Sequence, residues 1–443
     1  MKSQTISLSI NITPEQQGTY FTIPLTIPDG IAALTLSYRY DRHLAEPRPL
    51  AAGGFTAHPE VNIIDLGLIA PDGTQVGASG SDKTEIMVSE TTATPGYSSG
   101  PITPGQWQIL VGAYKVAPQG VQVQYEVRLD DKERQLLKGD LHTHTLASDG
   151  VHTPGELALK ARRHGLQFVA ITDHNQMISR AALPDGAGVT LIPGVEWTHY
   201  QGHANFLGVD QPYDGPFATN TLAEARALFQ SARDRGALIV INHPCDPDCG
   251  FNFDLQSFPY DCLEVWNGPM REPNLRAVGL WHQLLCTGLK IPICGGSDYH
   301  RDTPFIFLGG PTMCVQALSA GTSDILAAVR AGHGFITYAP NGPILELTAA
   351  DSLMGDTVAW PEVKTAHIKV QGLAQGDVVR AITAQREDVV FTAPADGEVS
   401  IMYTLDAPGF VRVDVLRAFL PGLPMLPALI SNPIYFEGEP NSG

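Results

Sequence analysis

Hydrophobic and polar residues alternate along the first 130 residues in short runs, with turn residues between them. Successive residues of a β-strand face opposite sides, so this alternation gives each run one apolar face and one polar face. Turns such as Pro71-Asp72-Gly73 separate the runs, and no long helical period interrupts them. The pattern therefore predicts an N-terminal β-sandwich over residues 1–130. The runs expected to form strands are Tyr20–Ile27, Ala33–Tyr40, Val61–Ile69, Thr84–Val88, Trp107–Val116 and Val121–Leu129.

After a charged linker, residues 137–345 alternate between short apolar runs and helical segments. Parallel strands need a crossover connection, usually a helix, so this repeated strand–helix order predicts a parallel barrel. The first helix is expected to begin with Thr153 as N-cap and Pro154 at its first position. The apolar runs are Phe168–Ile171, Thr190–Pro193, Ala237–Ile241 and Ile291–Cys294, and the helices are expected within residues 153–164, 221–236, 271–287 and 323–331.

Residues 346–443 return to the alternating pattern and predict a small C-terminal domain resembling a β-sandwich. Ile430–Tyr435 fits either a last strand or a tail that packs back on the barrel. Each flanking domain is expected to be structural, because a fold does not imply a function. The expected strands are Ala366–Val370, Val378–Thr383, Asp388–Thr392, Val399–Thr404 and Phe410–Leu416.

Histidines and carboxylates gather at or near the ends of the apolar runs of the central domain. His142 and His144 are spaced to point to one face of a strand, where both imidazoles can reach one ion. Strand ends of a parallel barrel converge on one mouth, so further ligands from other strands can join them. The residues placed in this way are His142, His144, Asp149, His174, Glu196, His203, His243, Asp298 and His300.

This ordered series resembles the metal-binding residues of the PHP (polymerase and histidinol phosphatase) family of metallohydrolases. The resemblance covers about residues 137–345. The segments Glu264–Gly268 and Phe335–Tyr338 also look like the multidomain CehA/McbA-type branch. The resemblance implies a distorted (βα)7 barrel, here flanked by the two β domains.

Carried over to this sequence, the resemblance implies three metal positions that hold two or three divalent ions, with zinc, manganese or iron as the candidates. Glu196 would bridge two of them, since a carboxylate offers two oxygens. Glu196, Asp298 and Arg301 are the candidate catalytic residues, although Arg301 fits a substrate clamp and a solvated surface arginine equally well. The three implied ligand sets are His142, His144, Glu196 and Asp298; Glu196, His203 and His243; and Asp149, His174 and His300.

Three features near these residues are not assigned to the ligand set. His199 is offset from Glu196 by an odd number of residues, and we expect it to be structural. Cys245 and Cys249 could bind zinc or form a disulfide, but no second cysteine pair completes a structural zinc site, so a plain loop is favoured. Asp173 is expected to support a ligand rather than to be one.

The expected activity is hydrolysis by a metal-activated water, with a small phosphate ester as the first substrate class. The same water could attack carbon, so a carboxylic ester, amide or carbamate hydrolase is the alternative. A binding or scaffold protein with a degenerate site is the alternative outside enzymes. The complete ligand set speaks against it, because no ligand position holds an apolar residue.

Composition limits the partners. The 443 residues include 46 acidic and 28 basic side chains, a net charge of −18, which disfavours nucleic acid because its binding relies on Lys and Arg. No apolar run reaches the ~20 residues that span a bilayer, and the N-terminus lacks the apolar region of a signal peptide. We therefore expect a cytoplasmic protein with a small-molecule substrate, no nucleic acid and no membrane partner. The sequence leaves the oligomeric state open.

Overall fold

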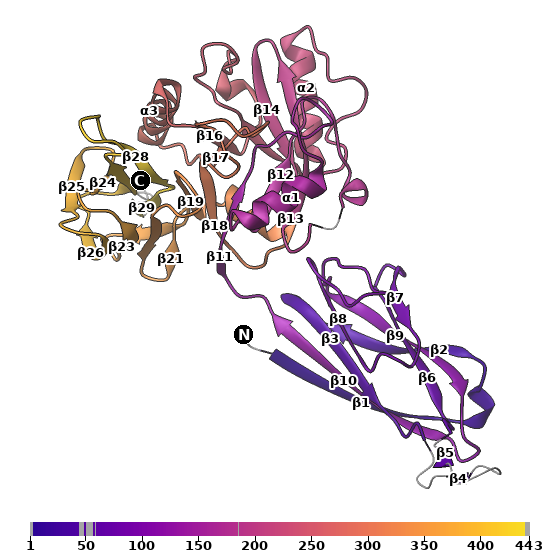
Figure 1. Ribbon diagram of the computed structural model, residues 1–443. Helices are drawn as coiled ribbons and strands as arrows, with labels where there is room; N and C mark the ends of the chain where they lie inside the picture. Colours follow the sequence, from indigo (N-terminus) through magenta and orange to yellow (C-terminus); the bar gives the residue numbers. More distant parts are fainter. Residues whose placement is uncertain (1–2, 44–47, 50–55, 58, 185, 439–443) are drawn as a thin grey trace, which may run out of the picture. The chain divides into compact units, whose positions relative to one another are not determined.

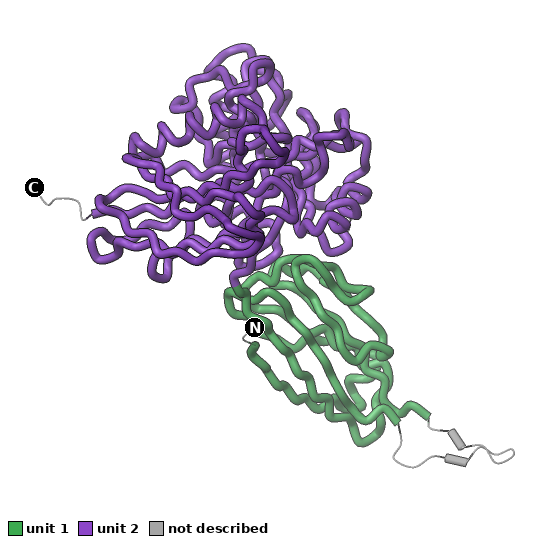
Figure 2. Tube along the Cα trace, turned by 60° about the vertical axis from the view of Figure 1, so that its left-hand side comes forward, with its two compact units in different colours: residues 1–133 green, residues 134–443 purple. Residues whose placement is uncertain are grey.

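The computed structural model describes residues 3–43, 48–49, 56–57, 59–184 and 186–438. The chain divides into two compact units, residues 1–133 and 134–443 (Figure 2). The C-terminal strands belong to the second unit, so a separate domain boundary near residue 345 stays a prediction. Over the residues just named, none of the helices combines the length and the apolar character needed to cross a bilayer.

Unit 1 consists of two four-stranded antiparallel sheets, in the orders β1-β10-β3-β8 and β2-β9-β6-β7, with one shared apolar core (Figure 1). This is the arrangement expected of a β-sandwich. The strand β1 was not among the expected runs, although Ile6, Leu8, Ile10 and Ile12 alternate along it. Its strands are β1 (Ser3–Ile12), β2 (Tyr20–Ile27), β3 (Ile31–Arg39), β4 (Arg48–Pro49), β5 (Thr56–Ala57), β6 (Ile63–Ile69), β7 (Gln75–Ser79), β8 (Glu85–Ser89), β9 (Gly105–Lys115) and β10 (Val121–Asp131).

Unit 2 begins with mixed α/β structure that contains the four expected helices. Two of these helices begin with a capping box in which the N-cap Thr and a Glu three residues later bond each other's backbone. The helices are α1 (Pro154–Arg163), α2 (Leu222–Asp234), α3 (Glu272–Cys286) and α4 (Thr322–Arg330). The strands of this part are β11 (Gln135–Asp140), β12 (Phe168–Ile171), β13 (Thr190–His199), β14 (Gly202–Leu207), β15 (Leu238–Ile241), β16 (Cys262–Asn267), β17 (Ile293–Gly296), β18 (Thr312–Ala317) and β19 (Gly334–Thr337).

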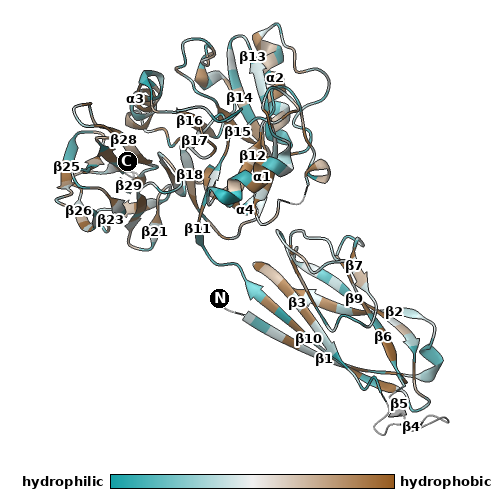
Figure 3. Cartoon of the chain, in the orientation of Figure 1, coloured by the Kyte–Doolittle hydropathy of each residue, from teal (hydrophilic) through white to brown (hydrophobic). Residues whose placement is uncertain are grey.

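The central sheet runs in the order β17-β16-β15-β14-β13-β12-β11-β18-β19. Thr143 after β11 forms a parallel bridge with Tyr299 after β17, so the run of strands from β11 to β17 curves back on itself. Every residue of β12, β15 and β17 is buried, and Figure 3 shows β12 and β15 within this part of the molecule. The carboxyl ends of these strands supply the residues considered below.

The expectation of a purely parallel arrangement is wrong at β14, β18 and β19. β18 is antiparallel to β11 and β19. β14 is antiparallel to both β13 and β15. The cause is local: only Tyr200 and Gln201 separate β13 from β14, and a link of two residues can join only antiparallel strands.

The C-terminal strands extend this sheet instead of forming an isolated body. β28 pairs with β19, and β27, β24 and β25 follow in order, while β21, β20, β23 and β26 form a second sheet. Ile430–Tyr435 is therefore divided between two strands, and the first of them packs back on the central sheet. The strands are β20 (Ile344–Ala349), β21 (Ser352–Leu353), β22 (Thr357–Trp360), β23 (Thr365–Leu373), β24 (Val378–Ile382), β25 (Glu387–Thr392), β26 (Gly397–Thr404), β27 (Gly409–Arg417), β28 (Leu426–Ser431) and β29 (Ile434–Gly438).

Candidate metal centre

The residues after β11 begin the site. The sequence placed His142 and His144 within a strand, but β11 ends at Asp140, and only Thr143 continues its extended course through the bridge to Tyr299. The buried carboxylate of Asp140 explains the sharp end: it accepts hydrogen bonds from the backbone N–H groups of His142 at 3.2 Å and Ser297 at 3.0 Å. The two histidines still face one side, as expected, because both reach Asp298.

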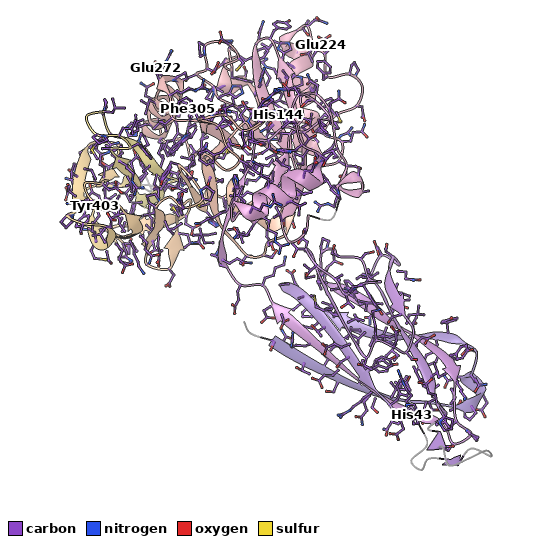
Figure 4. All side chains as sticks on the ribbon, viewed as in Figure 1. His43, His144, Glu224, Glu272, Phe305 and Tyr403 are labelled. Atoms are coloured by element: carbon purple, nitrogen blue, oxygen red, sulfur yellow. The ribbon has the colours of Figure 1, made fainter. Side chains whose placement is uncertain are left out.

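The first cluster contains His142, His144, Glu196 and Asp298. The Nε2 atoms of His142 and His144 lie 3.4 and 3.0 Å from Oδ1 of Asp298, and they lie 3.4 and 3.6 Å from the Glu196 carboxylate. Figure 4 shows His144 inside the α/β part of unit 2. Each of the four residues has a buried polar atom without a hydrogen-bond partner: His142 Nε2, His144 Nε2, Glu196 Oε2 and Asp298 Oδ1. Buried polar atoms are almost always satisfied, so four orphans that converge on one point fit a bound cation.

The second cluster contains His203 and His243 and shares Glu196 with the first. Oε1 of Glu196 lies 3.1 Å from Nδ1 of His203 and 3.5 Å from Nε2 of His243, and it accepts a hydrogen bond from Asn242 at 2.9 Å. His203 is placed on β14 opposite Thr198 of β13, so it shares the face of Glu196 across the hairpin. Oε1 also lies 3.4 Å from Nε2 of His142, while Oε2 lies near His144 and His174, so the Glu196 carboxylate lies between the clusters, where a bridging carboxylate must lie.

The third cluster contains Asp149, His174 and His300. Oδ1 of Asp149 lies 3.1 Å from Nε2 of His300 and 3.7 Å from Nε2 of His174. Nδ1 of His174 also lies 2.7 Å from Oε2 of Glu196, which connects this cluster to the other two. His144, Asp149, His174 and His300 together offer ligand atoms close enough to hold one ion.

The ionisable groups of the first cluster shift one another's pKa values. Burial alone would raise the pKa of Glu196, but His142, His174 and His203 hold it well below its usual range. Burial likewise would raise the pKa of Asp298, and His142 and His144 lower it instead. The pKa of His142 is raised well above its usual value because the carboxylates of Asp298 and Glu264 outweigh its burial. The carboxylates thus need positive charge nearby, which a divalent cation would supply more strongly than a proton.

Other residues singled out by the sequence lie outside these clusters. Arg301 is exposed, and its Nη2 donates to the backbone oxygen of Asp149 at 3.3 Å. His199 accepts from the N–H of Gln201 at 3.1 Å and lies 3.1 Å from the oxygen of Thr219, so its ring is held as a structural element. Asp173 accepts three hydrogen bonds, two from Thr145 and one from the Ser148 hydroxyl near His144.

Two residues of the site were not identified as site residues from the sequence. Cys249 was favoured as plain loop, yet its Sγ lies 3.6 Å from Nδ1 of His243 and groups with His203 and His243. Glu264 entered only as part of a family motif, yet it lies 3.0 Å from Nδ1 of His142. The sequence signal for Glu264 was present, because a carboxylate inside the apolar strand β16 needs buried partners.

Comparison with known proteins gives one family match. The model of the PHP domain matches residues 140–282. The 5'-3' exoribonuclease Rnm of Salmonella typhimurium is 39% identical over 113 residues, which cover 23% of this chain and 36% of that protein. The 3',5'-nucleoside bisphosphate phosphatase of Chromobacterium violaceum is 30% identical over 105 residues, which cover 22% of this chain and 36% of that protein. The chain therefore spans about a third of the length of these curated relatives.

A solved structure from Bacteroides vulgatus ATCC 8482 also resembles the chain. It is described as a two-domain protein containing a predicted PHP-like metal-dependent phosphoesterase. It is 17% identical, with a TM-score of 0.40, and the match covers 67% of this chain and 95% of that one.

Proposed function

The chain carries a PHP domain over residues 140–282, and on that premise we propose that it is a metal-dependent phosphoesterase acting on a small phosphate ester. The observation that supports this most is the convergence of four unpartnered buried atoms in the first cluster. Divalent ions bound there would supply a water nucleophile near neutral pH and neutralise charge on the phosphoryl oxygens. The two curated relatives above are named as enzymes that act on RNA and on a nucleoside bisphosphate.

We propose that the three ligand sets expected from the sequence hold two or three ions, with zinc, manganese or iron as candidates. The donors support this range, because imidazole suits all three metals and carboxylates favour manganese and iron. Cys249 adds a sulfur atom beside the second cluster, and a thiolate would favour zinc there. The bridge between Thr143 and Tyr299 supports a distorted (βα)7 barrel with these residues at its mouth. Membership of the CehA/McbA-type branch stays a prediction.

In this proposal the residues of the chain divide the work. Glu196 would contribute to neighbouring ion sites, and Asp298 would hold the first ion together with His142 and His144. Arg301, exposed next to Asp149, supplies a positive charge that can meet the phosphate of a substrate. The net charge of −18 repels a long nucleic acid, and only the metal ions bound at the site would attract phosphate. A small anion is therefore favoured as the substrate.

Hydrolysis at carbon is the second candidate, because the same ligands polarise a carbonyl as well as a phosphoryl oxygen. The test is a substrate panel on the metal-loaded protein: p-nitrophenyl phosphate, bis(p-nitrophenyl) phosphate, p-nitrophenyl acetate and a short RNA. We expect release of phosphate from the monoester. Acetate cleavage without phosphate release would move the assignment to carbon, and RNA cleavage alone would contradict the small substrate.

Two variants tie this activity to the site. His142→Ala and Asp298→Ala should each reduce turnover by at least about 100-fold, beyond the 10–100-fold typical of losing an outer partner of a metal ligand. The matched control is His367→Ala. The ring of His367 on β23 hydrogen-bonds to Ser400, and His367 belongs to none of the three clusters. Full turnover in both ligand variants would contradict the proposal.

A further inference from the structure

Beyond the proposed ligands, we propose that Glu264 is a positioning residue that connects the first and second metal clusters. The proposal rests on the metal site proposed above. Glu264 lies on β16, between β15 and β17 in the sheet. β15 ends beside Leu263, the residue before Glu264; His243 follows β15 and Asp298 follows β17, so Glu264 on the middle strand lies between a proposed ligand of each cluster. Its exposed fraction is 2%, and both of its oxygens contact residues of the site.

One oxygen orients a ligand of the first cluster. Oε1 of Glu264 lies 3.0 Å from Nδ1 of His142. An ionised carboxylate can only accept, so Nδ1 donates to it, and Nε2 would present its lone pair when an ion is bound. That Nε2 is one of the unpartnered buried atoms, and it faces Asp298 and Glu196. A carboxylate on the far nitrogen is the arrangement that fixes the tautomer of a metal-bound histidine and makes it a stronger ligand.

The other oxygen reaches both clusters. Oε2 accepts from the backbone N–H of His243 and from Nδ2 of Asn267, each at 3.1 Å. Nδ2 of Asn267 also donates to Oδ2 of Asp298 at 3.3 Å, which leaves Oδ1 of Asp298 directed at His142 and His144. Glu264 thus contacts His142 and His243 directly and Asp298 through Asn267.

The backbone supplies a reason for such support. His243 and Asp298 have φ angles of 27° and 52°, in the left-handed region that residues with a side chain rarely adopt. Strained conformations of this kind persist only where surrounding contacts hold them. Glu264 bonds the N–H of His243, and Asn267 bonds the carboxylate of Asp298, so each strained ligand is held by one member of the pair.

Glu264 does not fit the role of a further ligand. Its oxygens are engaged by His142, His243 and Asn267, and neither is among the unpartnered buried atoms of the described residues. Its effect on the metal must therefore pass through the residues that it holds.

The test is metal binding, measured separately from activity. Apo-protein would be titrated with Zn²⁺ and with Mn²⁺ by calorimetry, and ions per chain would be counted by elemental analysis. Glu264→Gln keeps the size of the side chain but replaces one carboxylate oxygen with an NH₂ group. That NH₂ group would face either the donor of His142 or the donors of His243 and Asn267. We expect affinity to fall 10–100-fold with altered occupancy of both clusters, the range typical of outer partners. The matched control is Glu346→Gln, because Glu346 is exposed on β20.

A second variant separates positioning from folding. Asn267→Ala removes the bonds of Asn267 to Glu264 and Asp298 but leaves Glu264 against His142 and His243, and we expect a smaller loss of affinity, mainly at the first cluster. Cobalt substitution adds a spectrum that reports ligand geometry, and the visible bands of Glu264→Gln should differ from those of the wild type. If Glu264→Gln does not fold, Asn267→Ala decides the question. The inference would be overturned if a folded Glu264→Gln kept the wild-type affinity, ion count and cobalt spectrum. If Glu264→Gln does not fold, the same result in Asn267→Ala would overturn it.

The result of this binding test can be told apart from a failure of the proposed function. A wild-type protein that binds its ions but hydrolyses none of the test substrates would contradict the phosphoesterase proposal. The effect of Glu264 on ion affinity could still be measured in that protein.

Discussion

At the scale of single residues, the site pairs buried carboxylates with histidines, and burial alone would keep both kinds of group neutral. Glu196 has an exposed fraction of 1%, yet His142, His174 and His203 keep its pKa low. The protein thus keeps a charged carboxylate at the centre of its clusters, where it can take part in two ion sites. The residues that gather in the clusters could be predicted from the sequence because their types and spacing are distinctive. Their neighbours Glu264 and Cys249 could not, because contacts between distant segments leave no local pattern.

Arg301 gives a prediction at this scale. Arg301→Ala should raise KM for p-nitrophenyl phosphate about tenfold and change kcat less, because a hydrogen bond to a charged group is worth ~1.5–3 kcal/mol and exposure reduces it. Steady-state kinetics would measure this, with Arg226→Ala on the exposed side of α2 as the matched control. An unchanged KM would mean that Arg301 is a solvated surface residue.

At the scale of elements, the hydrophobic pattern was most informative where strand and helix periods differ clearly. Three of the four helices lie within the expected ranges and α4 begins one residue earlier, at Thr322; capping boxes explain where α1 and α2 begin. The direction of β14 could not be predicted with the same ease. Its alternation is compatible with either direction, and only the two-residue link at Tyr200 and Gln201 decides it. Because of this hairpin, His203 reaches Glu196 from a neighbouring strand.

The capping box of α2 gives a prediction for this scale. Thr221 accepts from the N–H of Glu224 at 3.2 Å, and the Glu224 carboxylate accepts from the N–H of Thr221 at 2.9 Å. Thr221→Ala should lower the free energy of unfolding by about 1 kcal/mol, the usual value for an N-cap. Urea unfolding followed by circular dichroism would measure it. Thr221→Ser, which keeps the hydroxyl, should retain wild-type stability, and an equal loss in both variants would show that the cap is not the cause.

At the scale of the whole molecule, every proposed ligand and every partner that holds it lies in unit 2. The hydrophobic pattern predicted three domains, but it could not show that the C-terminal strands would continue the central sheet. That continuity depends on the pairing of β19 with β28, residues almost a hundred positions apart, such as Phe335 with Ser431. Pairings over such a distance depend on the tertiary fold, so a single sequence does not specify them.

This division predicts that unit 2 can work alone. Residues 134–443 have their own apolar cores and should fold without unit 1, binding the same number of ions per chain as the full protein. Thermal unfolding and elemental analysis of the two proteins would test this. An insoluble or metal-free fragment would show that unit 1 contributes to the stability of the site.

The most direct test of the central claim is to measure metal content and turnover in one sample. The purified protein would be stripped with a chelator, reloaded with Zn²⁺, Mn²⁺ or Fe²⁺, and assayed with p-nitrophenyl phosphate at each stage. We predict two or three ions per chain, loss of phosphate release on chelation, and its return on reloading. A protein that binds no ion after reloading, or that releases phosphate equally well without metal, would contradict the account.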